Sequence, residues 1–161
     1  MKDKQPTYDE VVIKEYPNST HLIQGQRVIA AGNLVLTSER LVFIHRIPIS
    51  GEEIARLRIL SAKITTREMI DLTIPFHKKN FQVPLSSIVS AKTGLNSFFP
   101  FPRPCLRISY STGKRKQHVE MLTFMFTIPL WKGWFQLEIT TVTAWVSTIR
   151  RVLRYRRSAA T

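Results

Sequence analysis

The sequence has little cysteine and no long apolar run. Cys105 is the one cysteine among 161 residues, which excludes an intrachain disulfide and a zinc site built from several cysteines. No uncharged stretch approaches the roughly 20 apolar residues that a membrane-spanning helix needs. The first six residues carry charges where an export signal would be apolar. These absences predict a cytoplasmic protein that contacts a membrane, if at all, only peripherally.

Acidic residues are also scarce. Only 11 Asp and Glu residues stand against 24 Lys and Arg residues, so the net charge is +13 and the isoelectric point is about 10.5. The remaining composition, with 43% hydrophobic residues, is that of an ordinary globular domain. Such an excess of positive charge indicates an anionic partner, which would be a nucleic acid, an acidic membrane surface or an acidic protein.

The sequence contains no arrangement of residues that is typical of an enzyme. Its six glycines are scattered and form no phosphate-binding loop. Its four histidines lack the spacing of paired metal ligands; they are His21, His45, His77 and His118. Cys105 begins a predicted strand and is expected to be buried. The sequence therefore predicts a non-enzymatic protein without a cofactor or a metal.

Short β-rich runs separated by turn residues predict a largely β structure. Residues 1–10 are polar and are expected to be disordered. Predicted turns lie at Tyr16–Thr20, Gly32-Asn33 and Thr37–Glu39. The predicted strands are Val11–Ile13, Leu22–Ile23, Val28–Ala31, Leu34–Leu36, Leu41–Ile44, Phe81–Val83 and Ile88–Ala91, followed by a hairpin over 105–121. In this hairpin the apolar side chains alternate, as they do in a strand with one buried face.

Two segments have a helical period instead. A helical insertion is expected at about 51–74, where Ser50–Glu53 forms a capping box. Within this insertion, Thr65 or Thr66 would begin a second helix that Pro75 ends at about Ile74. The C-terminal segment is also predicted to be helical, beginning at Thr140 or Thr141. Its apolar side chains share one side of the helix; they are Val142, Trp145, Val146, Ile149, Val152 and Leu153.

The stretch from Gly32 to Phe43 resembles the opening motif of GRAM domains, a branch of the pleckstrin-homology-like superfamily. The matching residues are Leu34, Leu36, Thr37, Arg40, Leu41 and Phe43. Val83–Ile88 resembles the family's next strand and turn, Leu106–Gly113 its late hairpin, and the segment with Trp145 its closing helix. These features follow the family's order over most of residues 24–155.

The resemblance implies a mainly β (α+β) fold, which is a seven-stranded, bent sandwich or barrel capped by a C-terminal helix. In this chain it would form a single domain over residues 11–157, with the helical insertion at about 51–74 and a short tail at 158–161. The resemblance also implies binding to lipid headgroups or proteins without catalysis. We expect structural roles for Thr37 at the turn, for Arg40 at the start of a strand and for Trp145 in the core.

Basic residues in or near predicted loops are the candidates for binding an anion. They are Lys78, Lys79, Lys92, Arg103, Arg107, Lys114, Arg115 and Lys116. Pleckstrin-homology domains that bind inositol phosphates resemble one another in a basic pattern on their first two strands, where this chain has only Lys14 and Arg27. The five arginines between Arg150 and Arg157 either complement the dipole of the last helix or bind a partner.

Aromatic residues are the candidates for contact with a membrane or a partner. They are Phe98, Phe99, Phe101, Trp131, Trp134 and Phe135. The first three lie in a loop that contains three prolines and is therefore excluded from the middle of a sheet. Exposed aromatic rings with cations nearby suit a membrane interface, whereas buried rings would only fill the core.

The leading hypothesis is a binding module that associates with an acidic membrane surface or an acidic protein partner through basic loops and exposed aromatic residues. One alternative is nucleic-acid binding, because bases stack on aromatic rings and phosphates pair with cations. The sequence contains no recognised nucleic-acid-binding motif, however. A third hypothesis is an interaction module that forms a homodimer through the aromatic loops.

Overall fold

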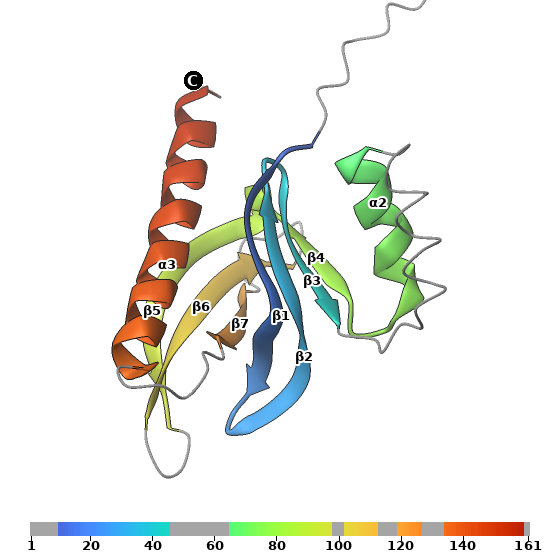
Figure 1. Ribbon diagram of the computed structural model, residues 1–161. Coiled ribbons are helices and arrows are strands. Elements are labelled where there is room, and N and C mark those ends of the chain that lie inside the picture. Colours follow the sequence, from blue (N-terminus) through green and yellow to red (C-terminus); the bar gives the residue numbers. More distant parts are fainter. Residues whose placement is uncertain (1–9, 46–64, 98–101, 113–118, 127–133, 160–161) are drawn as a thin grey trace, which may run out of the picture.

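The computed structural model describes residues 10–45, 65–97, 102–112, 119–126 and 134–159 (Figure 1). The strands are β1 (Val12–Gln24), β2 (Arg27–Thr37), β3 (Arg40–His45), β4 (Phe81–Pro84), β5 (Ile88–Asn96), β6 (Arg103–Ser111) and β7 (Val119–Phe126). The helices are α2 (Thr66–Thr73), the 3₁₀ turns Ile74–Phe76 and Leu85–Ser87, and α3 (Trp134–Ala159). The capping box predicted at Ser50–Glu53 lies outside the described residues.

The seven strands form one antiparallel sheet in the order β4-β3-β2-β1-β7-β6-β5. Phe43 of β3 and Phe124 of β7 are three strands apart in this order, yet their ring centroids are 6.0 Å apart. In a flat sheet, three strand spacings would separate them by about 14 Å. The sheet therefore bends over itself, and its two halves enclose one core. The predicted seven strands and closing helix are confirmed.

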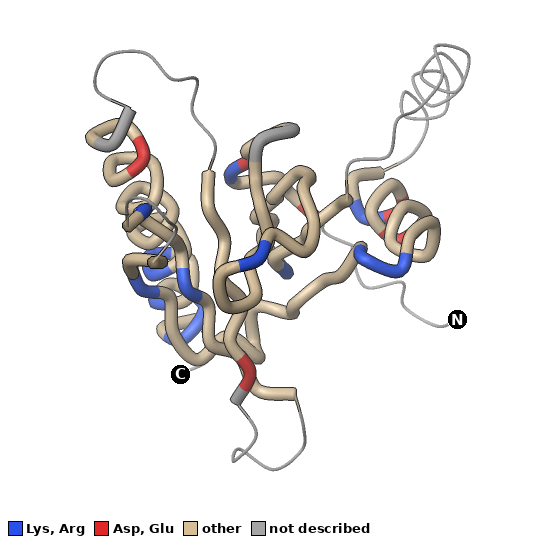
Figure 2. Tube along the Cα trace, turned by 90° about the horizontal axis from the view of Figure 1, so that it is seen from below, with Lys and Arg blue, Asp and Glu red and all other residues tan. Residues whose placement is uncertain are grey.

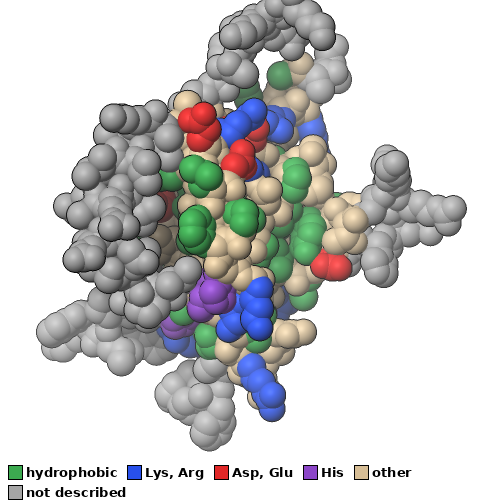
Figure 3. Space-filling view, turned by 90° about the vertical axis from the view of Figure 1, so that its right-hand side faces the viewer, with side chains coloured by type: hydrophobic (Ala, Val, Ile, Leu, Met, Phe, Trp, Pro, Cys, Tyr) green, Lys and Arg blue, Asp and Glu red, His purple; other side chains and the backbone are tan. Residues whose placement is uncertain are grey.

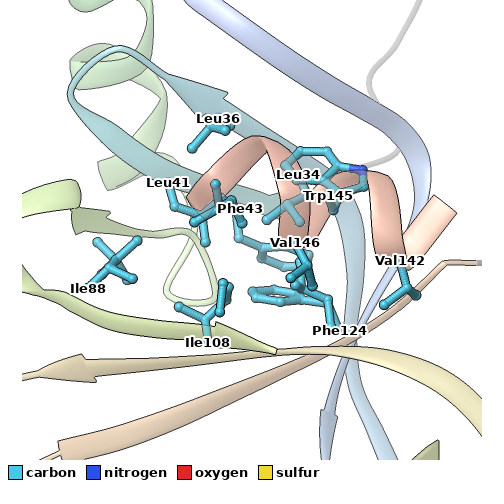
Figure 4. Close-up of a cluster of buried hydrophobic side chains, with 14 of the residues drawn as sticks. Leu34, Leu36, Leu41, Phe43, Ile88, Ile108, Phe124, Val142, Trp145 and Val146 are labelled. Carbon is cyan, nitrogen blue, oxygen red and sulfur yellow. The ribbon is translucent and has the colours of Figure 1, made fainter. Parts of the chain in front are cut away.

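Helix α3 covers the open side of this core (Figure 4). Trp145 is fully buried, and its ring stacks on that of Phe126 with the centroids 5.7 Å apart. Val142, Val146 and Ile149 are buried beside it, which confirms the predicted apolar side of the helix. The helix begins at Trp134, however, and not near Thr140. The Thr140 hydroxyl donates to the Gln136 carbonyl, so this residue lies inside the helix rather than capping it.

Two of the predicted turns are wrong, because both segments lie inside strands. Tyr16–Thr20 lies within β1, and the chain absorbs the irregularity as a shift of register against β2. Gly32 lies in the middle of β2, where a Cβ atom would collide with the Ile44 carbonyl of β3. Glycine is needed there for close approach of two backbones rather than for a turn. The turn between β1 and β2 instead contains Gly25, with φ +60.

Helix α2 is the described part of the predicted helical insertion. Thr65 is its N-cap and forms a reciprocal capping box with Glu68. Of the two predicted starting residues, Thr65 and Thr66, Thr65 is therefore the N-cap. The α-helix ends at Thr73, and Pro75 lies in the 3₁₀ turn that follows it. Ile70 is buried against Val35 and Val42, so α2 packs on the outer face of β2 and β3.

A cluster of charged residues, here called the Arg40 cluster, joins the chain before β1 to the β2–β3 turn and to α2. The Glu10 side chain is fully buried, and Arg40 Nη2 lies 2.7 Å from Glu10 Oε2. Arg40 Nη1 lies 2.6 Å from Asp71 Oδ1 of α2. The cluster is completed by Thr37, which donates to Glu10, and by an ion pair between Arg67 and Glu39. Glu10 is the first described residue and is held by these contacts, whereas residues 1–9 of the segment predicted to be disordered lie outside the described residues.

Candidate anion-binding groove

Strand β5 forms one edge of the sheet, and α3 runs beside it (Figure 1). The strand pairs with β6 through the register Ala91↔Ile108 and Thr93↔Leu106. The buried side of α3 anchors the helix against β5, β6 and β7 through Trp145 and Ile149. A groove therefore forms between the unpaired edge of β5 and the flank of the helix that lies next to its buried side.

Five cations line the two stretches of the groove, of which the larger has a volume of about 700 Å³. One stretch of it is lined by Lys92 of β5 and by Arg150, Arg151 and Arg154 of α3. A smaller depression continues from it along Lys92, Arg150 and Arg154 to Arg157. Residues 150, 154 and 157 are four and then three positions apart, which places them on one side of the helix. Figure 2 shows the basic positions of α3 in the C-terminal part of the helix.

The arginine nearest the strand contacts the backbone of β5 directly. Arg150 Nε donates a hydrogen bond of 3.0 Å to the Ala91 carbonyl. This carbonyl therefore points away from β6 and into the groove. In an antiparallel strand the N–H and C=O groups of one residue point to the same side, and this side repeats at every second residue. The N–H group of Ala91 and both backbone groups of Thr93 therefore face the groove too. The groove thus offers strand backbone on one wall and guanidinium groups on the other.

The electrostatics of the groove are one-sided. None of the residues that line it is acidic. In the part of the chain that the structure describes, Lys92, Arg150, Arg151 and Arg154 form no ion pair with a carboxylate. The hydroxyl groups of Thr93, Thr143 and Ser147 add neutral donors to the lining. Such a set of donors is complementary to an anion, since arginine and lysine have no acceptor of their own.

The structure brings only some of the predicted basic candidates together. Lys92 lies in the groove. Arg107 is its register partner on β6, but its Nη2 donates a hydrogen bond of 2.8 Å to the Leu95 carbonyl. Arg103 forms an ion pair with the buried Glu138 of α3. Lys78 and Lys79 follow α2, and Figure 2 shows α2 and α3 on opposite flanks of the molecule. Lys114, Arg115 and Lys116 lie outside the described residues.

The predicted aromatic candidates do not form a described site. Phe98, Phe99, Phe101 and Trp131 lie outside the described residues. Trp134 and Phe135 form the first turn of α3, but their side chains are also outside the description. Lys14, from the expected inositol-phosphate region, lies 5.5 Å from the centroid of the Trp145 ring. It therefore packs on the core helix.

The arginines of α3 are the part of the groove that sequence reasoning left undecided. Their spacing next to the apolar side of the helix was the available signal. The same spacing also suits a helix C-terminus, whose dipole favours cations. Only the position of Lys92 opposite them, 58 residues earlier in the chain, distinguishes a lined groove from a solvated helix end.

The described histidines and Cys105 do not gather into a metal site. Among the residues that the structure describes, no group of three or more His, Cys, Asp or Glu side chains could hold a metal ion. Cys105 is fully buried beside Ile23 and Met125, as predicted, and this burial raises the pKa of its thiol. The rings of His45 and His77 stack with centroids 4.3 Å apart. Burial and the neighbouring His45, Lys79 and Lys78 lower the pKa of His77.

A comparison with solved structures finds a structural likeness. No protein-family profile matches the sequence, and no curated protein matches it. A solved structure described as the Vps36 N-terminal PH domain is similar to this chain with a TM-score of 0.43 and 16% sequence identity. The match covers 90% of this chain and 83% of that structure. Across the described helices, none has the length and apolar content needed to cross a membrane.

Proposed function

We propose that this chain is a binding module without catalytic activity, and that its basic groove binds an extended acidic segment of a protein partner. The observation that carries the proposal is the position of five cations beside the free edge of β5, with no acidic residue in the lining. Free strand edges bind extended peptides through main-chain hydrogen bonds, and flanking side chains then set the specificity. Here that specificity would be for carboxylate or phosphate groups.

The shape of the groove favours a polypeptide segment over a flat lipid surface. The cations line a concave surface between a helix and a strand, with the Ala91 carbonyl turned into it. A segment lying along β5 would pair with the backbone at Ala91 and Thr93, while its acidic side chains would reach Arg150 and Arg154. Arg150 would then exchange its bond to Ala91 for one to the ligand.

A fluorescence-anisotropy titration tests this proposal. The probe is a labelled peptide of alternating glutamate and serine, and a peptide with glutamine in place of glutamate is the neutral control. We expect binding of the acidic peptide only, with an affinity that falls as salt rises. Arg154→Glu should weaken binding by about tenfold or more, because it replaces an attractive contact by a repulsive one.

The matched control is Arg156→Glu, which makes the same charge change on the same helix outside the cationic stretch of the groove. If Arg154→Glu and Arg156→Glu weaken binding equally, net charge alone would explain the affinity and the groove would have no special role. A single-stranded oligonucleotide of equal charge provides the second comparison. Tighter binding of this oligonucleotide than of the acidic peptide would favour the nucleic-acid alternative and contradict the proposal.

A further inference from the structure

Helix α2 exposes apolar side chains on the side that does not pack on the sheet. Its buried residue Ile70 faces Val35 and Val42. Met69 is 41% exposed, Leu72 59% and Phe76 76%. Met69 and Leu72 are three positions apart on α2 and therefore share one side of the helix, and Phe76 ends the 3₁₀ turn that directly follows α2. A phenylalanine with this degree of exposure can provide an apolar contact surface.

Cations directly follow this apolar stripe. Lys78 and Lys79 lie in the turn after Phe76, and both are exposed. Lys79 Nζ donates a hydrogen bond of 2.8 Å to the carbonyl of Ile29 in β2. Ile29 is itself 39% exposed. This hydrogen bond joins the turn after Phe76 to the exposed apolar residue Ile29 of β2. We call the six residues the α2 surface: Ile29, Met69, Leu72, Phe76, Lys78 and Lys79.

The acidic residues near this surface have partners elsewhere. Asp71 is paired with Arg40, and Glu68 caps the start of α2 through Thr65. In the described part of the chain, Lys78 and Lys79 form no ion pair. The space-filling view in Figure 3 shows histidine and basic side chains side by side on the lower part of this face, with apolar side chains nearby.

We propose that the α2 surface docks on an anionic membrane, with Phe76 and Leu72 entering the interface and Lys78 and Lys79 contacting lipid phosphates or acidic headgroups. Apolar side chains with flanking lysines match both layers of a membrane surface, since the lysines reach the headgroups while their stems and the rings lie deeper. The basic groove offers the opposite arrangement, which is concave and polar. This inference does not depend on ligand binding by the groove.

Flotation of the full chain with lipid vesicles tests this inference. The vesicles are made of phosphatidylcholine alone or of phosphatidylcholine with phosphatidylserine. We expect the chain to float with the acidic vesicles only. Phe76→Ser should lower the partition coefficient by about tenfold, because it removes one large apolar side chain from the interface. Lys78→Glu with Lys79→Glu should lower it by at least about tenfold as well.

Matched controls make the result specific to this surface. Met121→Ser removes another exposed apolar side chain, on β7, and should change partitioning less than about twofold. Lys92→Glu with Arg154→Glu reverses two charges in the groove and should retain most of the binding. The inference is overturned if wild-type chain ignores acidic vesicles, if Phe76→Ser floats like wild type, or if the groove variant loses as much binding as the lysine variant.

A label on the surface gives an independent readout. Cys105 is fully buried, so a polarity-sensitive thiol dye can be attached selectively to Leu72→Cys. Acidic vesicles should shift the emission of this dye to shorter wavelength and leave the same dye on Met121→Cys unchanged. Equal shifts at both positions would show contact without orientation and would contradict the proposed docking surface.

Discussion

The Arg40 cluster and the basic groove use the same type of side chain in opposite ways. In the cluster, Arg40 is only 12% exposed and is held by the carboxylates of Glu10 and Asp71. Hydrogen bonding to Glu10 raises the pKa of Arg40 despite the opposing effect of burial. In the groove, the arginines are exposed and the lining has no carboxylate. Arginines with internal partners hold the fold together, whereas arginines without them remain available to an external anion.

The net charge of +13 therefore includes cations of two kinds, those paired with carboxylates inside the chain and those that line the groove. Arg40, Arg67 and Arg103 all have carboxylate partners within the chain, so they contribute little to an attractive field. Five cations are instead concentrated on one groove whose lining has no carboxylate: Lys92, Arg150, Arg151, Arg154 and Arg157. Location and pairing therefore say more about function than the total charge.

Breaking the Arg40 cluster should have the largest effect on stability. Arg40→Ala leaves the buried Glu10 carboxylate without its main partner, and removal of one partner from a buried ion pair typically costs about 3–5 kcal/mol. Urea unfolding followed by circular dichroism measures the change. Glu10→Gln should cost less, because the amide still accepts a hydrogen bond. If Arg40→Ala cost no more than a surface substitution, the division into structural and available arginines would be wrong.

The stability contributed by Glu10 should depend on pH. Burial alone would raise its pKa, but hydrogen bonds from Arg40 and Thr37 and the charges of Arg40 and Arg67 outweigh this effect and lower the pKa below its ordinary value of 4.5. A carboxyl group with a lowered pKa stabilises the folded state above its unfolded-state pKa. This contribution is lost as pH falls through the folded-state pKa.

The difference in unfolding free energy between wild type and Glu10→Gln should therefore be full at neutral pH and should shrink as the pH falls below 4.5. Urea titrations at a series of pH values measure it, with Arg154→Ala as a control whose difference from wild type stays constant. A difference between wild type and Glu10→Gln that grew on acidification would mean that Glu10 is destabilised rather than stabilised by its surroundings.

The smallest expected changes in unfolding free energy are those of Arg150→Ala and Arg154→Ala in the groove, and they should differ from each other. Arg150→Ala removes the hydrogen bond to the Ala91 carbonyl and should cost about 1 kcal/mol of unfolding free energy. Arg154→Ala should stay within about 0.5 kcal/mol of wild type, since it is exposed and has no ion pair among the described residues. Urea titration of each variant measures its unfolding free energy. Equal losses would show that the bond to Ala91 contributes nothing to stability.

The strands were predictable where apolar side chains alternate over a buried face. Leu106 and Ile108 are fully buried, so the pattern of the late hairpin reflects real packing. Thr37 also has the structural role expected of it, because its hydroxyl accepts from the backbone amides of Glu39 and Arg40 at the turn. These features depend on neighbours in sequence, which is why local patterns reveal them.

The errors occurred where distant residues decide the local structure. Gly32 looks like a turn residue until β3 places the Ile44 carbonyl next to it. Glu10 lies in a polar stretch, and its burial depends on Arg40, which is 30 positions away. The groove likewise joins Lys92 to Arg150 only because the sheet bends and α3 returns to its edge. No local pattern encodes such contacts.

The position of the groove also affects how copies of this protein meet. An unpaired strand edge such as β5 is a site where two copies could join their sheets. Two such edges facing each other would bring ten cations together, and the repulsion would keep them apart at low salt. An acidic ligand that neutralises the groove would remove this protection. The cations beside β5 would therefore disfavour edge-to-edge pairing of two copies whenever the groove carries no acidic ligand.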